Sequence, residues 1–196
     1  MISIHKAWTV CLSLFFMVLC SQVFASAKAE LQSLVPEVHA IASESDIMSS
    51  VAAANQSHAT LSAKDIRVLG REWHQGLVGK KSQILTQVNS SDLSAKLKNI
   101  QAESKGKYLG FVVTDAKGLV IGQTYNAKHY SEAHRTIWSK IDKDGVKATY
   151  LSKPKKTTSG NVAILGLPIV EANKVIGAIL VNVPVTLKAD KSAKTH

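Results

Sequence analysis

Side chains able to bind a small anion lie close together in the middle of the chain: Tyr130, His134, Arg135 and Trp138. We expect a helix from about residue 131 to residue 141, because apolar residues recur there at helical spacing. On such a helix Tyr130 and His134 share one face with two isoleucines, and Arg135 and Trp138 lie on the adjoining stripe. Arginine can bind a carboxylate through two parallel hydrogen bonds, while histidine and tyrosine fix its orientation. These residues therefore predict a site for a small carboxylate.

Arg135 alone cannot supply the binding energy of such a site. Micromolar affinity corresponds to about 8 kcal/mol, and a charge-assisted hydrogen bond contributes about 1.5–3 kcal/mol. Further contacts must come from elsewhere in the fold, and we expect them from Tyr125, Thr149 and Asn161. The alternative reading is structural, with Tyr130 as a core anchor and Arg135 as a solvated surface residue.

No pattern in the chain is typical of an enzyme or a metalloprotein. It contains no Gly-x-Ser-x-Gly, no Walker A loop and no Gly-x-Gly-x-x-Gly. His129 and His134 have no companion cysteine and the other histidines are scattered, whereas a zinc site needs three or four converging ligands. Asp115 stands first in a tight turn, where its carboxylate would cap backbone N–H groups. We therefore expect no catalysis, no metal site and no cofactor.

The first 27 residues have the pattern of a secretion signal. His5 and Lys6 give a basic start, an apolar run follows from residue 7 to residue 18, and small residues at 23–27 suit signal peptidase. Cys11 and Cys20 both fall inside this segment, so no disulfide is expected in the mature protein. The predicted localisation is periplasmic. An uncleaved signal that anchors the protein to the inner membrane is the alternative.

The chain is basic, with a formal net charge of +10. Export argues against a nucleic-acid partner, and the lysines are scattered rather than concentrated on one helix. The densest groups are in a predicted loop at 153–156 and in the polar tail at 187–196. We expect these charges to serve solubility, with attraction to anionic lipid or an acidic partner as the lesser possibility.

The elements that must position the candidate site form a helical half, 28–105, and a sheet half, 106–186. In the helical half, Ser62 is a predicted N-cap, and another helix is expected to start at Ser90 or Ser91. In the sheet half, runs rich in β-branched residues predict strands at 108–114, 119–123, 161–167 and 174–183. We predict an α+β fold in which the N-terminal helices pack on a curved five-stranded antiparallel sheet. Each of these four runs contains a glycine, which requires a curve or a close neighbour, and Pro168 fits only an edge or a bulge.

This order of elements resembles the Cache superfamily, also called PDC sensor domains, which are extracytoplasmic relatives of the PAS fold. The residues that carry the resemblance are 111–120, then Tyr130, 132–133 and Trp138, the last strand at 173–181, and upstream Asn55, Ile66 and Trp73. The resemblance covers nearly the whole of 28–186, in the single-module form.

The resemblance implies a small-molecule ligand, of the organic acid or amino acid class, in a pocket over the sheet. The segment 124–145 would close this pocket. His129 is a further candidate ligand residue. It stands where the family often has an acidic residue, which argues against an amine ligand. The implied role is a ligand-binding sensor. Because we find no kinase, cyclase or methyl-accepting output in the sequence, we expect it to relay ligand binding to a separate membrane receptor. The alternative is a ligand-free periplasmic interaction or scaffold module of the same fold.

Overall fold

The computed structural model describes residues 27–158 and 160–186, and both the predicted signal peptide up to residue 26 and the basic tail from 187 lie outside them. Residues 27–33 are helical and lead into the first labelled helix. The helices that precede the sheet are α2 (Val35–Ala42), α3 (Ser45–Ser57), α4 (Ala63–Leu77), α5 (Gln83–Asn89) and α6 (Asp92–Glu103). None of the described helices is long and apolar enough to cross a membrane.

Local side-chain caps fix where α4, α5 and α6 begin. Ser62 precedes α4, its hydroxyl accepts a hydrogen bond from the backbone N–H of Asp65 at 3.2 Å, and the Asp65 carboxylate accepts one from the Ser62 N–H at 2.9 Å. This reciprocal capping box satisfies two N–H groups that the first turn leaves without helical partners. Ser91 caps α6 through a single bond, by accepting from the N–H of Ser94 at 3.1 Å. Both caps confirm the sequence prediction.

The second half of the chain forms one antiparallel sheet. Its order is β2-β1-β6-β5-β3, and β4 also pairs with β5. The strands are β1 (Gly110–Asp115), β2 (Val120–Gln123), β3 (Tyr150–Leu151), β4 (Lys155–Thr157), β5 (Gly160–Glu171) and β6 (Lys174–Pro184). The α+β, PAS-like fold class predicted from the sequence is confirmed.

The sheet has six strands rather than the predicted five. Strand β5 is longer than expected, so that β3 pairs with its middle and β4 with its start. Pro154, which has no backbone N–H, lies between these two short strands. Pro168 lies beyond the reach of β3, where β5 pairs only with β6, so it occupies an edge position as predicted.

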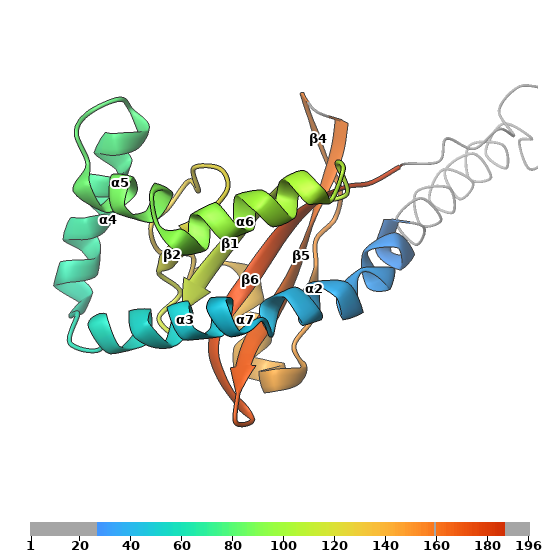
Figure 1. The fold of residues 1–196 in the computed structure, drawn as a ribbon, viewed down its shortest axis with the longest axis horizontal. Coiled ribbons are helices and arrows are strands. Elements are labelled where there is room, and N and C mark those ends of the chain that lie inside the picture. The colour runs from blue at the N-terminus through green and yellow to red at the C-terminus, as the bar shows by residue number, and fades with distance from the viewer. Residues whose placement is uncertain (1–26, 159, 187–196) are drawn as a thin grey trace, which may run out of the picture.

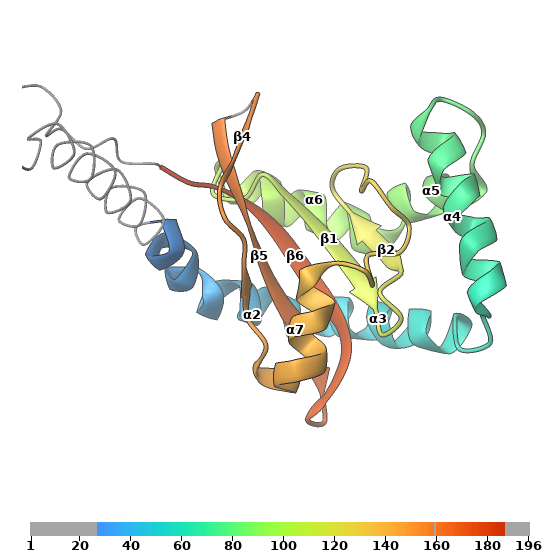
Figure 2. The ribbon, with the colours of Figure 1, turned by 180° about the vertical axis from the view of Figure 1, so that it is seen from behind.

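Helices cover both faces of the sheet, as Figures 1 and 2 show from opposite sides. Helices α2, α3 and α6 lie across one face, which buries Phe111, Val113 and Val181 in one apolar cluster. The helix α7 (Thr136–Asp144) lies on the other face, where Val112 and Leu180 belong to a second cluster. Because side chains alternate along a strand, neighbouring residues serve opposite faces. Helices α4 and α5 stand to one side of the sheet (Figure 1).

The turn between β1 and β2 is fixed to the end of α3 by a group of buried polar contacts. Asp115 is fully buried, and its carboxylate accepts hydrogen bonds from the backbone N–H groups of Lys117 at 2.9 Å and Leu119 at 2.8 Å. This confirms the predicted capping role. The other carboxylate oxygen lies 2.7 Å from Nδ1 of His58. The Lys117 ammonium donates to the carbonyls of His58, Ala59 and Leu61 at 2.8–3.0 Å, so the α3–α4 turn is attached to the sheet.

Helix α7 begins later than the sequence predicts. Residues 130–132 are extended along the outer edge of β2: the N–H of Val120 donates to the carbonyl of Tyr130 at 2.8 Å, and the N–H of Glu132 donates to that of Gly118 at 2.7 Å. Arg135 is the N-cap residue, and the helix starts at Thr136. The expected helical face shared by Tyr130 and His134 therefore does not form, because pairing with the sheet edge prevents helical hydrogen bonding there.

Candidate ligand-binding site

Tyr125, one of the predicted site residues, lies directly over the sheet on the α7 side. A Cβ at Gly110 would be 2.4 Å from Cδ1 of Tyr125, so the ring occupies the space that a side chain on β1 would need. Likewise, a Cβ at Gly166 on β5 would be 3.0 Å from Cδ1 of Ile137 in α7. The strand glycines thus allow the covering layer to approach the backbone closely.

The hydroxyl of Tyr125 is surrounded by polar groups from three parts of the chain. The side chain of Asn182, a residue of β6 that pairs with Gly110, is near enough to influence the hydroxyl. Although 39% of the residue is exposed, desolvation of the hydroxyl raises the pKa of Tyr125. The polar side chain of Asn182 and the charge of Arg135 oppose this rise in pKa, and the charge of Glu132 adds to it. Arg135, Glu132 and Asn182 thus lie near enough to Tyr125 to influence its hydroxyl.

Arg135 is paired with an acid that the sequence interpretation did not assign to the site. Its Nη1 lies 3.0 Å from Oε2 of Glu132, whose side chain is only 3% exposed, while the Arg135 side chain is 33% exposed. Burial strengthens such a pair relative to one in water, since solvent screens it less. The sequence did contain a signal for it, because an acid three residues before an arginine is a common local pair.

Three buried side-chain polar atoms in the segment 130–138 have no hydrogen-bond partner among the described residues. They are Tyr130 Oη, Glu132 Oε1 and Trp138 Nε1. Leaving a buried donor or acceptor unsatisfied costs about 1–3 kcal/mol each. Such atoms are uncommon in native proteins and are expected to have a reason. We call the group formed by Tyr125, Glu132, Arg135, Trp138 and Asn182 the α7 site.

His129, Tyr130 and His134 lie away from the α7 site, toward α4. The rings of His129 and His134 meet edge to face, with centroids 4.9 Å apart. All three residues line a cavity of about 870 Å³ whose other wall is α4. Tyr130 packs against Trp73 of α4 with ring centroids 5.5 Å apart. Burial, and secondarily the charge of Asp115, raises the pKa of Tyr130 to about 12.

The two remaining predicted residues, Asn161 and Thr149, do not belong to the group around Arg135. Along β5, Asn161 points to the same face of the sheet as Ala163 and Leu165, because alternate side chains of a strand share a face. Ala163 and Leu165 pack against the layer of α2, α3 and α6, so Asn161 is on the face opposite to α7. Thr149 precedes β3, and it is the next residue, Tyr150, that pairs with Gly166 and packs in the α7-side cluster. Sequence alone could not fix these faces, because a register shift of one residue reverses them.

Nowhere in 27–158 and 160–186 do three or more His, Cys, Asp or Glu side chains form a group that could hold a metal ion. Asp115 and His58 form a close pair, but the carboxylate is already used by two backbone N–H groups. Their arrangement is therefore that of a structural contact between α3 and the sheet.

No protein-family model and no curated protein matches the sequence. Solved structures similar to it are sensor domains and the ligand-binding domains of chemoreceptors. The sensor domain of the histidine kinase DctB from V. cholerae has 14% identity and a TM-score of 0.47, covering 90% of this chain and 57% of that chain. The E. coli DcuS sensor domain has 16% identity and a TM-score of 0.38, with 62% and 87% covered. The ligand-binding domain of the Pseudomonas aeruginosa amino acid chemoreceptor PctC, in complex with GABA, has 14% identity and a TM-score of 0.39, with 77% and 59% covered. The chain thus spans less than two thirds of the DctB and PctC chains.

Proposed function

We propose that this protein is a ligand-binding sensor module and that its α7 site binds a small organic acid or amino acid. One observation carries the proposal: Glu132 Oε1 and Trp138 Nε1 are buried without hydrogen-bond partners in the segment that also supplies Arg135. A donor, an acceptor and a cation in one segment are complementary to a carboxylate and an ammonium group. A ligand that satisfied them would recover the energy that their burial costs.

The ion pair between Arg135 and Glu132 does not block this role. A guanidinium has five N–H donors, and the pair is formed through Nη1 alone. The remaining donors can bind a carboxylate, with the Tyr125 hydroxyl nearby. The free oxygen of Glu132 supports an amino acid over a simple acid, since it can accept from an ammonium group. His129, whose identity argued against an amine, lies in the α4 cavity rather than here.

The place and mode of action remain proposals from the sequence. The apolar N-terminal segment with its small residues at 23–27 supports export to the periplasm. N-terminal sequencing of the protein from the cell envelope tests this, with a start after residue 25 or 27 as the expected result. Relay of ligand binding to a separate membrane receptor would require that the ligand favours one conformation of the module over another.

A thermal-shift screen against amino acids, organic acids and amines tests the binding function. At a hundredfold excess over Kd, a ligand stabilises the folded state by about 2.7 kcal/mol. For a ligand so found, calorimetry should show Kd raised about tenfold to hundredfold in Arg135→Ala, because a charge-assisted hydrogen bond contributes about 1.5–3 kcal/mol. Glu132→Gln should weaken the binding of amino acids more than the binding of organic acids that lack an amine.

The matched control is Lys156→Ala, which removes an exposed cation of β4 outside the α7 site. It should leave Kd unchanged. Equal affinity in wild type and Arg135→Ala would remove the α7 site from consideration. A screen without any stabilising compound would favour the scaffold alternative.

A further inference from the structure

The cavity between α4 and the segment 128–134 is strongly cationic and is separate from the α7 site. It has a volume of about 870 Å³. We call it the α4 groove. Its basic lining residues are Arg67, Arg71, His74, Lys128, His129 and His134, and no Asp or Glu lines it.

The two arginines of the α4 groove are free of acidic partners. Arg67 and Arg71 are exposed, and neither forms an ion pair with any acid of the described residues. Both acids of α4 are used elsewhere. Asp65 is part of the capping box, and Glu72 accepts from the backbone N–H groups of Gln83 at 2.6 Å and Ile84 at 3.1 Å. The positive charge of the groove is therefore not neutralised from within.

Buried contacts hold the two walls of the α4 groove in place. Nε1 of Trp73 donates to the carbonyl of Ala127 at 2.9 Å, and both residues are buried. On the other wall, Tyr130 is attached to β2 through its backbone. The elements that carry the cations of the groove are thus already held in place before a partner binds.

The shape of the α4 groove favours a chain rather than a single anion. The α4 residues that line it, from 66 to 77, extend along roughly 16 Å of helix, at 1.5 Å per residue. Arg67 and Arg71 are one helical turn apart, roughly 6 Å, and alternate side chains of an extended peptide are spaced at roughly 7 Å. Apolar Ile66 and Leu77 also line the groove. A segment with acidic side chains at alternate positions and apolar ones between them would complement both kinds of lining.

We propose that the α4 groove is a docking surface for an extended acidic segment of a partner protein. The inference goes beyond the proposed function, because the groove can bind such a segment whether or not the α7 site binds a ligand. Complementary charge would speed the encounter and select the partner, and the apolar contacts would add residence time.

A direct test uses the purified protein and a fluorescent peptide of five residues that alternates glutamate and leucine. Fluorescence anisotropy should show binding that weakens as sodium chloride rises, because the contacts are exposed. In NMR spectra, the amide signals that shift should be those of 66–77 and 128–134. A peptide with glutamine in place of glutamate should not bind.

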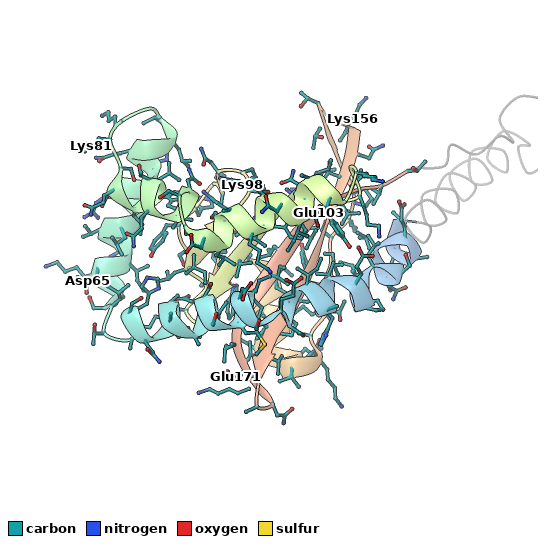
Figure 3. The ribbon with its side chains drawn as sticks, in the orientation of Figure 1. Asp65, Lys81, Lys98, Glu103, Lys156 and Glu171 are labelled. Carbon is teal, nitrogen blue, oxygen red and sulfur yellow. The ribbon has the colours of Figure 1, made fainter. Side chains whose placement is uncertain are left out.

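The decisive variant is Arg67→Gln with Arg71→Gln, for which we expect binding at least about tenfold weaker. Its control is Lys155→Gln with Lys156→Gln, which removes the same charge from β4; Figure 3 shows Lys156 far from α4. If the arginine variant does not fold, as judged by circular dichroism, Lys128→Gln with His129→Gln provides the same test from the other wall.

Several outcomes would overturn the proposal. They are no binding of the peptide to the wild type, equal binding to the arginine variant, and equal weakening by the β4 control. Citrate binding as tightly as the peptide would show a small-anion site instead. Tighter binding of a single-stranded oligonucleotide of the same charge would show a nucleic-acid surface instead.

Discussion

Removing the carboxylate of Asp115 should loosen the attachment of α3 to the sheet. In Asp115→Ala, the backbone N–H groups of Lys117 and Leu119 and Nδ1 of His58 lose their partner together. An unsatisfied buried group costs about 1–3 kcal/mol, and only the bond to Leu119 is fully buried. Water can reach the other two, so we expect a loss of about 2–4 kcal/mol. That is a large part of the 5–15 kcal/mol that holds a typical domain folded.

Urea denaturation followed by circular dichroism measures this loss directly. Asp115→Asn keeps an oxygen that can accept from the turn but removes the charge facing His58, so it should be destabilised less than Asp115→Ala. Asp142→Ala, on the exposed side of α7, is the control and should change stability little. A loss below about 1 kcal/mol in Asp115→Ala would refute the claim that this buried carboxylate anchors the turn.

Two further perturbations follow from contacts on the α7 side of the sheet. Gly110→Ala places a Cβ 2.4 Å from the Tyr125 ring, so we expect a loss of about 1–3 kcal/mol in urea denaturation and weaker ligand binding in calorimetry. Gly70→Ala meets nothing within 4 Å and is the control; equal stability of both variants would contradict the close approach. The pKa of Tyr130 is raised from 10.0 to about 12, so the folded state keeps its proton where the unfolded chain ionises, and stability should fall as pH rises from about 10 to about 12. Tyr130→Phe should show a shallower fall in denaturation curves measured across that range, and an unchanged slope would speak against the assignment.

The local features of the fold could be predicted from the sequence. The caps at Ser62 and Ser91 and the turn at Asp115 involve hydrogen bonds to residues within four positions in the chain. Such bonds depend on residue type and spacing, which the sequence displays. The α+β class follows for the same reason, since strand composition and helical periodicity are local patterns.

The composition of the candidate site was decided by tertiary structure. Arg135 and Tyr125 were predicted together, but Asn182 reaches Tyr125 only because β6 pairs with β1 in one particular register. Asn161 falls on the opposite face because of the register of β5. His134 lies beside α4 and is not part of α7. Residues 130–132 pair with the edge of the sheet, so they cannot form the first turn of a helix that would include His134. Pairings between distant segments set these positions, and a single sequence specifies them only through the energy of the whole fold.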